Sequence, residues 1–150
     1  MPQRYHASCF VICPLGDIGS PERERSDRLF KLIIEPVCKS AGLYAFRADM
    51  MKSPTPITRD IFAALQKSFI VIADITDHNP NVFFERGYRA AFAYPCIQLA
   101  EDGTSLPFDV KDKRTIFYNL SDPDRIAKTQ SDIADAIRSI AQHVSVMDRI

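Results

Sequence analysis

The sequence predicts an α/β fold, a flavodoxin-like three-layer sandwich around a five-stranded parallel sheet. Strand-like and helix-like segments alternate along the 150 residues, which is typical of a parallel sheet with helices on both faces. The clearest strand segments, residues 10–12 and 69–73, are continuously apolar, as expected of strands covered on both sides. Right-handed crossovers then favour the strand order 2-1-3-4-5, with residues 1–150 forming a single domain.

Five strand segments and four helical segments carry this prediction. The strands are expected at residues 8–14, 43–47, 69–73, 96–100 and 115–118. The helices are expected at residues 21–40, 57–67, 81–94 and 124–146. Ser20 and Pro21 are typical of an N-cap and a first helical residue, and Pro36 is expected to kink the first helix before Gly42 ends it. The last helix has a nearly heptad apolar repeat, which fits packing on the sheet or on a partner.

Charge and cysteine usage exclude several classes of protein. Lys+Arg and Asp+Glu balance at 19 each, so the chain lacks the basic surface that binding to nucleic acid requires. No run of about 18 apolar residues occurs, and the polar N-terminus does not resemble a signal peptide, so no membrane association is expected. The four cysteines and three histidines lack metal-ligand spacing, so no metal site is expected. Buried, reduced thiols indicate a cytoplasmic protein.

Polar residues gather where the predicted strands end. Ligands of open parallel sheets bind beyond the carboxyl ends of the strands. The candidate substrate-binding residues at these ends are Pro14, Leu15, Gly16, Asp17, Arg47, Asp49, Asp74, Asp77 and Asn81. Turn formation and helix capping also explain Asp77 and Asn79, so the residue types leave both interpretations open.

Glu85 is the candidate catalytic residue. It stands between Phe84 and Gly87, in a helix whose other residues are mostly apolar. A glutamate in the first helical turn also gains from the helix dipole, which is a purely structural reason for its presence. The same dipole is expected to keep the carboxylate ionised at neutral pH. On these grounds alone, a structural and a catalytic role remain equally open.

Several segments resemble a known family. They are residues 10–16, 47–49, 72–76, 79–87 and 107–109, with sequences FVICPLG, RAD, IADIT, NPNVFFERG and PFD. In this order they are similar to prokaryotic TIR-like domains related to nucleoside 2-deoxyribosyltransferases, including those fused to bacterial STING-type sensors in antiphage defence. The resemblance spans about residues 8–118, and it implies a flavodoxin-like fold and cleavage of an N-glycosidic bond.

The resemblance also implies roles for single residues. The family's catalytic glutamate corresponds to Glu85, its aspartates after the third strand to Asp74 and Asp77, and its loop after the first strand to residues 14–17. The family often has leucine where this chain has Arg86. In the TIR branch NAD is the substrate rather than a cofactor, and it is split into nicotinamide and linear or cyclic ADP-ribose.

Three functional hypotheses follow. The first is an NAD glycohydrolase effector, activated by homo-oligomerisation and by a fused or partner cyclic-nucleotide sensor. The second is a nucleoside or nucleotide N-glycosidase or 2-deoxyribosyltransferase, in which Asp74 or Asp77 protonates the leaving base. The third is a non-catalytic TIR scaffold that acts only by assembly. Both enzymes form an oxocarbenium-like transition state, which a carboxylate stabilises.

Overall fold

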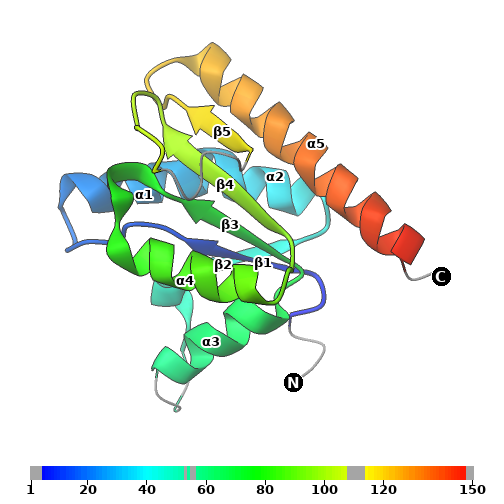
Figure 1. Ribbon diagram of the computed structural model, residues 1–150. Helices are drawn as coiled ribbons and strands as arrows, with labels where there is room; N and C mark the ends of the chain where they lie inside the picture. Colours follow the sequence, from blue (N-terminus) through cyan, green and yellow to red (C-terminus); the bar gives the residue numbers. More distant parts are fainter. Residues whose placement is uncertain (1–4, 53, 55–56, 108–113, 148–150) are drawn as a thin grey trace.

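The computed structural model describes residues 5–52, 54, 57–107 and 114–147. Its centre is a sheet of five parallel strands (Figure 1). They are β1 (Ser8–Ile12), β2 (Tyr44–Arg47), β3 (Ile70–Asp74), β4 (Cys96–Glu101) and β5 (Thr115–Tyr118). The strand order β2-β1-β3-β4-β5 confirms the prediction, and every neighbouring pair is parallel. All carboxyl ends therefore lie at one edge, on the left of Figure 1.

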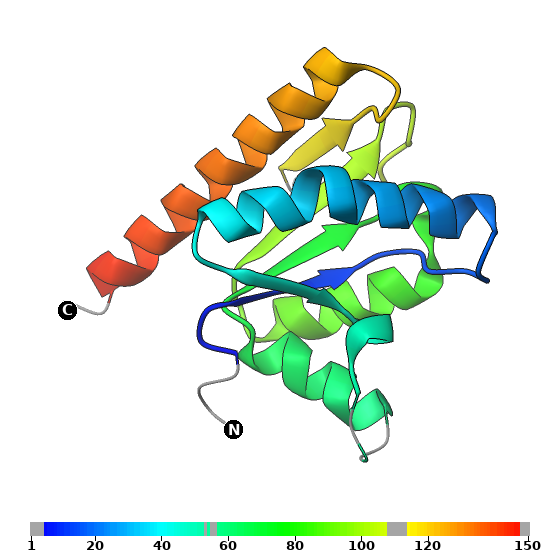
Figure 2. The same cartoon turned by 180° about the vertical axis from the view of Figure 1, so that it is seen from behind.

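Helices cover both faces of the sheet. They are α1 (Pro21–Leu29), α2 (Glu35–Ser40), α3 (Ile57–Lys67), α4 (Pro80–Ala91) and α5 (Pro123–Met147). A π-helical turn, η2 (Phe30–Ile34), joins α1 to α2, and two 3₁₀ turns, η3 (Ala48–Met50) and η4 (Thr76–His78), follow β2 and β3. The α1–α2 unit and α5 lie on one face, and α3 and α4 lie on the other (Figures 1 and 2). Among the described residues, no helix combines the length and apolar character needed to cross a membrane.

The side chains of the sheet alternate between two hydrophobic cores. In β1, Cys9 and Val11 belong to the core beneath α1, α2 and α5. Phe10 and Ile12 belong to the core beneath α3 and α4. Burial on both faces explains why the strands have continuous apolar sequences rather than alternating ones.

The first helix contains a π-helical turn just before Pro36. Proline has no N–H, so the carbonyl of Leu32, four residues earlier, loses its usual helical partner. Gln130 of α5 donates its side-chain amide to this carbonyl at 2.8 Å. The expected irregularity at Pro36 is thus a local π-helical turn, and the helical path continues to Ser40.

The bounds of α4 differ from the prediction at both ends. The Asn79 side chain accepts hydrogen bonds from the backbone N–H groups of Asn81 and Val82, so the helix begins at Pro80 rather than residue 81. It ends at Ala91 rather than residue 94, and Ala93 adopts a positive φ of 55°. With this start, Glu85 is the sixth residue of α4 and lies in its second turn, so it is not the first-turn glutamate that was expected.

Candidate functional site

The loop after β1 forms a tight turn at the carboxyl edge. Gly16 has a φ of +57°, and a Cβ at this position would lie 2.7 Å from Ser20 Oγ. That hydroxyl caps α1 by accepting a hydrogen bond from the backbone N–H of Arg23 at 3.2 Å. Pro14 is buried and its carbonyl accepts a hydrogen bond from Ser26, whereas Asp17 is exposed and Leu15 is half-buried. Glycine is therefore needed at residue 16 both for its backbone conformation and for space.

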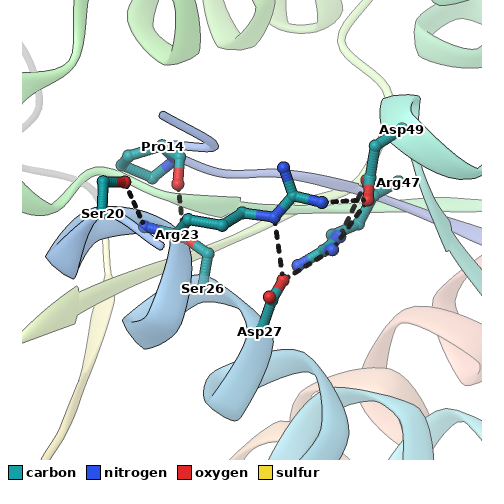
Figure 3. Close-up of polar contacts among 7 residues, drawn as sticks. All are labelled: Pro14, Ser20, Arg23, Ser26, Asp27, Arg47 and Asp49. Carbon is teal, nitrogen blue, oxygen red and sulfur yellow. Dashed lines mark hydrogen bonds and ion pairs between the residues drawn. The ribbon is translucent and has the colours of Figure 1, made fainter. Parts of the chain in front are cut away.

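Arg47 and Asp49 belong to an ion-pair network between β2 and α1 (Figure 3). Arg47 donates through Nε and Nη2 to the two carboxylate oxygens of Asp49, at 3.0 and 2.9 Å. Its Nη2 also lies 2.8 Å from Asp27 Oδ1. Arg23 lies 3.2 Å from Asp27 and 3.1 Å from Asp49, so two arginines and two aspartates balance each other. Arg47 and Asp49, which were predicted to bind substrate, thus connect the end of β2 to α1.

Asp74 lies beneath the surface of the carboxyl edge and is fully buried. One oxygen accepts hydrogen bonds from the backbone N–H and the hydroxyl of Thr76, at 3.1 and 2.5 Å, and the other accepts from the Tyr118 hydroxyl at 2.8 Å. The Thr76 hydroxyl accepts in turn from the backbone N–H of Glu101. Burial raises the pKa of Asp74, although its hydrogen-bond donors oppose the shift. This network joins β3, β4 and β5.

Asp77 occupies a strained turn after β3. Asp77 and His78 have positive φ values of 60° and 53°, which are uncommon for residues other than glycine. The exposed carboxylate of Asp77 lies 3.1 Å from Arg25 Nη1 on α1. Two adjoining cavities of about 530 and 420 Å³ lie here, and both are lined by Glu101 and Asp102. Arg25 lines the first cavity, and Asp77 and His78 line the second.

Glu85 lies in the second turn of α4 and is half-buried. Burial alone raises the pKa of its carboxyl to about 7. The expectation that the helix dipole keeps Glu85 ionised at neutral pH is therefore wrong, because desolvation outweighs any dipole effect beyond the first turn. Within the described part of the chain, no side chain or backbone group forms a hydrogen bond or ion pair with this carboxyl. Glu85 thus has a poorly solvated carboxyl with a pKa near neutrality, which is typical of catalytic groups.

The predicted residues do not converge on one place: beyond the loop at residues 14–17, they lie at four places along the carboxyl edge. Arg47 and Asp49 pair with α1, Asp74 is sealed among strands, and Asp77 faces the cavities. Asn81 is exposed in the first turn of α4, four residues before Glu85.

Sequence reasoning missed the partners Arg23, Arg25, Asp27 and Tyr118. The run Glu-Arg-Glu-Arg at residues 22–25 is typical of a solvated helix face, and no local signal shows that Arg25 reaches a residue 52 positions away. Tyr118 likewise ends an ordinary apolar strand, and only the strand order brings it close to Asp74.

Comparison with known proteins supports the fold. No protein-family model and no curated protein matches the sequence. A solved 2-deoxyribosyltransferase from Bacillus psychrosaccharolyticus is 12% identical with a TM-score of 0.59, covering 80% of this chain and 96% of that one. A solved CMP N-glycosidase from Clostridium botulinum is 16% identical with a TM-score of 0.55, covering 81% and 96%.

A third structure, a 2-deoxyribosyltransferase from Leishmania mexicana, is 14% identical with a TM-score of 0.48. The match covers 63% of this chain and 65% of that one. The two higher-scoring structures show that the chain has the fold of nucleoside deoxyribosyltransferases. Their low identity assigns no activity to it.

Proposed function

We propose that this protein cleaves the N-glycosidic bond of a nucleoside or nucleotide, with Glu85 as the catalytic carboxyl group. The observation that carries the proposal is the half-buried Glu85 carboxyl, whose pKa is raised to about 7 on a helix that starts at the carboxyl edge. The fold supports it, because a 2-deoxyribosyltransferase and a CMP N-glycosidase are among the similar structures, both with TM-scores above 0.5.

Cleavage of an N-glycosidic bond suits a catalytic carboxylate that is poorly solvated. As the bond to the base breaks, positive charge develops on the anomeric carbon, and the ionised Glu85 stabilises it or attacks that carbon. In the covalent route, a Glu85 oxygen bonds to the anomeric carbon as the bond to the base breaks. The bonding electron pair leaves with the base, which takes a proton from solvent water. Water then releases the sugar in hydrolysis, or a second base accepts it in transfer. A desolvated carboxylate is the stronger nucleophile because no water shell must be removed.

The two aspartates first considered as acids for the leaving base have other partners. Asp74 is buried and accepts hydrogen bonds from Thr76 and Tyr118. Asp77 pairs with Arg25. We expect neither carboxyl to reach a leaving base while these partners are in place.

NAD is therefore kept as a second candidate substrate. Nicotinamide leaves as a neutral base and needs no proton, which suits a site whose aspartates are both engaged. The resemblance of the sequence to TIR-like domains implies the same substrate. In that reading the protein is an effector in antiphage defence, activated by oligomerisation and by a cyclic-nucleotide sensor.

A panel of substrates tests the proposal. The purified protein is incubated separately with ribonucleosides, deoxynucleosides, their 5′-monophosphates and NAD, and the free base is measured by chromatography. Release of a purine or pyrimidine base is the expected result. Release of nicotinamide alone would move the substrate to NAD. Absence of any release, with the protein folded and present at high concentration, would contradict the proposal and favour the scaffold hypothesis.

A further inference from the structure

Only two residues of α4, a helix that the structure describes completely, are buried. They are Val82 near its start and Arg89 near its end. The side of a helix that meets a core normally carries three or four apolar residues over two turns. In α4 an arginine takes one of these places, and the neighbouring Phe83 and Tyr88 are only half-buried. Fully buried apolar contacts therefore hold only the first half of α4.

Backbone carbonyl groups anchor the second half of α4 through Arg89, which is only 1% exposed. Its Nε and Nη2 donate to the carbonyl of Pro95 at 3.2 and 3.0 Å. Its Nη1 donates to the carbonyl of Leu65 at 2.9 Å, and its Nη2 also donates to that of Phe69 at 3.2 Å. The ring of Tyr94 lies 5.2 Å from the guanidinium carbon. Within the described chain Arg89 has no acidic partner, so these carbonyl groups must satisfy a buried charge that is costly to leave unpaired.

The three carbonyl groups belong to three different segments. Leu65 lies in the last turn of α3, where backbone carbonyls lack helical partners, and α3 lies beside α4 on the same face of the sheet (Figures 1 and 2). Phe69 and Pro95 directly precede β3 and β4. A guanidinium holds its donors in a rigid planar fork. Hydrogen bonds from this fork to three segments therefore fix how α4 is rotated about its own axis.

Glu85 lies between the two buried residues of α4. It follows Val82 by three residues and precedes Arg89 by four, and side chains at these spacings share one face of a helix. The rotation of α4 that buries Arg89 therefore also turns Glu85 toward the sheet. Burial alone raises the pKa of Glu85, with no contribution from a neighbouring charge. Arg89 therefore acts on Glu85 through the placement of the helix and not through its own charge.

We propose that Arg89 is a positioning residue for Glu85: its hydrogen bonds to three carbonyl groups fix the rotation of α4 that turns Glu85 toward the sheet. As a role in catalysis, this inference rests on the function proposed above. An apolar residue at position 89 would fill the same space but would supply no directional contact. The helix could then turn about Val82 and bring the carboxyl of Glu85 closer to water. A catalytic group displaced by about 1 Å can lose about 10²-fold in rate.

The alternative role for Arg89 is to stabilise the fold without affecting Glu85. A cation at the C-terminus of α3 interacts favourably with the dipole of that helix, and this alone would account for a buried arginine. In that case loss of Arg89 lowers the stability of the protein but leaves the surroundings of Glu85 unchanged. The pKa of Glu85 separates the two roles, because it reports how far burial removes water from this carboxyl.

Titration of the Glu85 carboxyl by ¹³C NMR, in the absence of substrate, tests the proposal. The signal is assigned by its loss in Glu85→Gln. Arg89→Met keeps a long apolar side chain without a donor, and in this variant the pKa of Glu85 should fall from about 7 toward 4.5, by at least about one pH unit. Arg89→Lys retains the charge and fewer donors, so the pKa of Glu85 should lie between those of Arg89→Met and the wild type.

Ile133→Ala is the control for a general loss of stability. Ile133 is fully buried beneath α5, in the core on the opposite face of the sheet, so its truncation destabilises the protein without touching α4. The pKa of Glu85 should stay at about 7 in this control. Far-UV circular dichroism checks that each variant is folded, and if Arg89→Met does not fold, a fall of the pKa in Arg89→Lys decides. Folded Arg89 variants in which Glu85 titrates as it does in the control would overturn the proposal.

The rate of base release distinguishes this inference from the proposed function. At saturating substrate Arg89→Met should be at least about tenfold slower than the wild type, and Arg89→Lys should recover part of the rate. The acidic limb of the pH profile should move to lower pH in Arg89→Met, because Glu85 ionises earlier. A wild-type rate and pH profile in folded Arg89→Met would overturn the positioning role. A wild type that releases no base would contradict the proposed function, and the titration would still decide whether Arg89 places Glu85.

Discussion

Replacing Glu85 by glutamine should stabilise the protein at alkaline pH. The folded protein holds the pKa of this carboxyl at about 7, against 4.5 for an unperturbed glutamate. Below pH 4.5 the carboxyl is protonated in both the folded and the unfolded chain, and the folded state carries no penalty. As the pH rises through 4.5, the unfolded chain ionises first, so the free energy of unfolding falls. The loss is complete above pH 7.

The size of this stabilisation follows from the shift in the pKa of Glu85. The pKa shift from 4.5 to about 7 corresponds to roughly 3 kcal/mol at 1.36 kcal/mol per unit. Because the side chain is half-buried rather than sealed, water screens part of this penalty, and about 1–2 kcal/mol is expected. Glutamine cannot ionise, so Glu85→Gln should raise the unfolding free energy at pH 8 by this amount, or Tm by roughly 2–8 °C.

Urea unfolding followed by far-UV circular dichroism at pH 4.5 and pH 8 measures the effect. The variant and the wild type should be equally stable at pH 4.5 and should differ only at pH 8. Glu35→Gln on α2 is the control, because Glu35 is exposed and should give no pH-dependent gain. A Glu85→Gln protein that is no more stable than the wild type at pH 8 would refute the account of a desolvated carboxyl.

Three further substitutions test the carboxyl edge, each by thermal or urea unfolding. Gly16→Ala should destabilise by about 1–3 kcal/mol, because alanine is strained at φ +57° and its Cβ displaces the Ser20 cap; an unchanged Tm would contradict this. Tyr118→Phe should cost about 1.5–3 kcal/mol by removing a donor from buried Asp74, and an effect under 0.5 kcal/mol would argue against that hydrogen bond. Arg47→Met should cost about 1–2 kcal/mol at low salt, because Asp27 and Asp49 would then share Arg23 as their cationic partner; an unchanged stability would show that the ion pairs of Arg47 contribute little.

Much of the fold could be predicted from the sequence because its signals are local. The continuous apolar runs identify the buried strands, and the residue type of Asn79 favours a cap, a role the structure confirms because its side chain accepts two backbone hydrogen bonds at the start of α4. The predicted start of that helix was one residue late. The strand order then follows from general rules for crossovers between parallel strands, and the structure confirms it.

The environment of Glu85 could not be predicted in this way. The residue types of α4 do not show which side of the helix packs on the sheet, so the sequence did not distinguish a solvated glutamate from a half-buried one. The buried Arg89 was equally hidden, because arginine is mostly exposed and its acceptors are backbone carbonyls in α3 and two loops. Both features depend on which face of α4 meets the sheet.

The long-range ion pairs were hidden for a related reason. Arg23 and Arg25 alternate with glutamates on α1, and each reaches an aspartate in a loop after a different strand. Such contacts depend on the spatial neighbours of α1, and the helical pattern of its own residues carries no information about them.

The central claim is that Glu85 performs the cleavage of an N-glycosidic bond. Its most direct test is the rate of base release from the substrate that the panel identifies, compared between Glu85→Gln and the Glu35→Gln control at saturating substrate. We expect a rate at least about 10²–10⁴-fold lower for Glu85→Gln, with the control at the wild-type rate. Base release by a folded Glu85→Gln protein within tenfold of the wild type would contradict it.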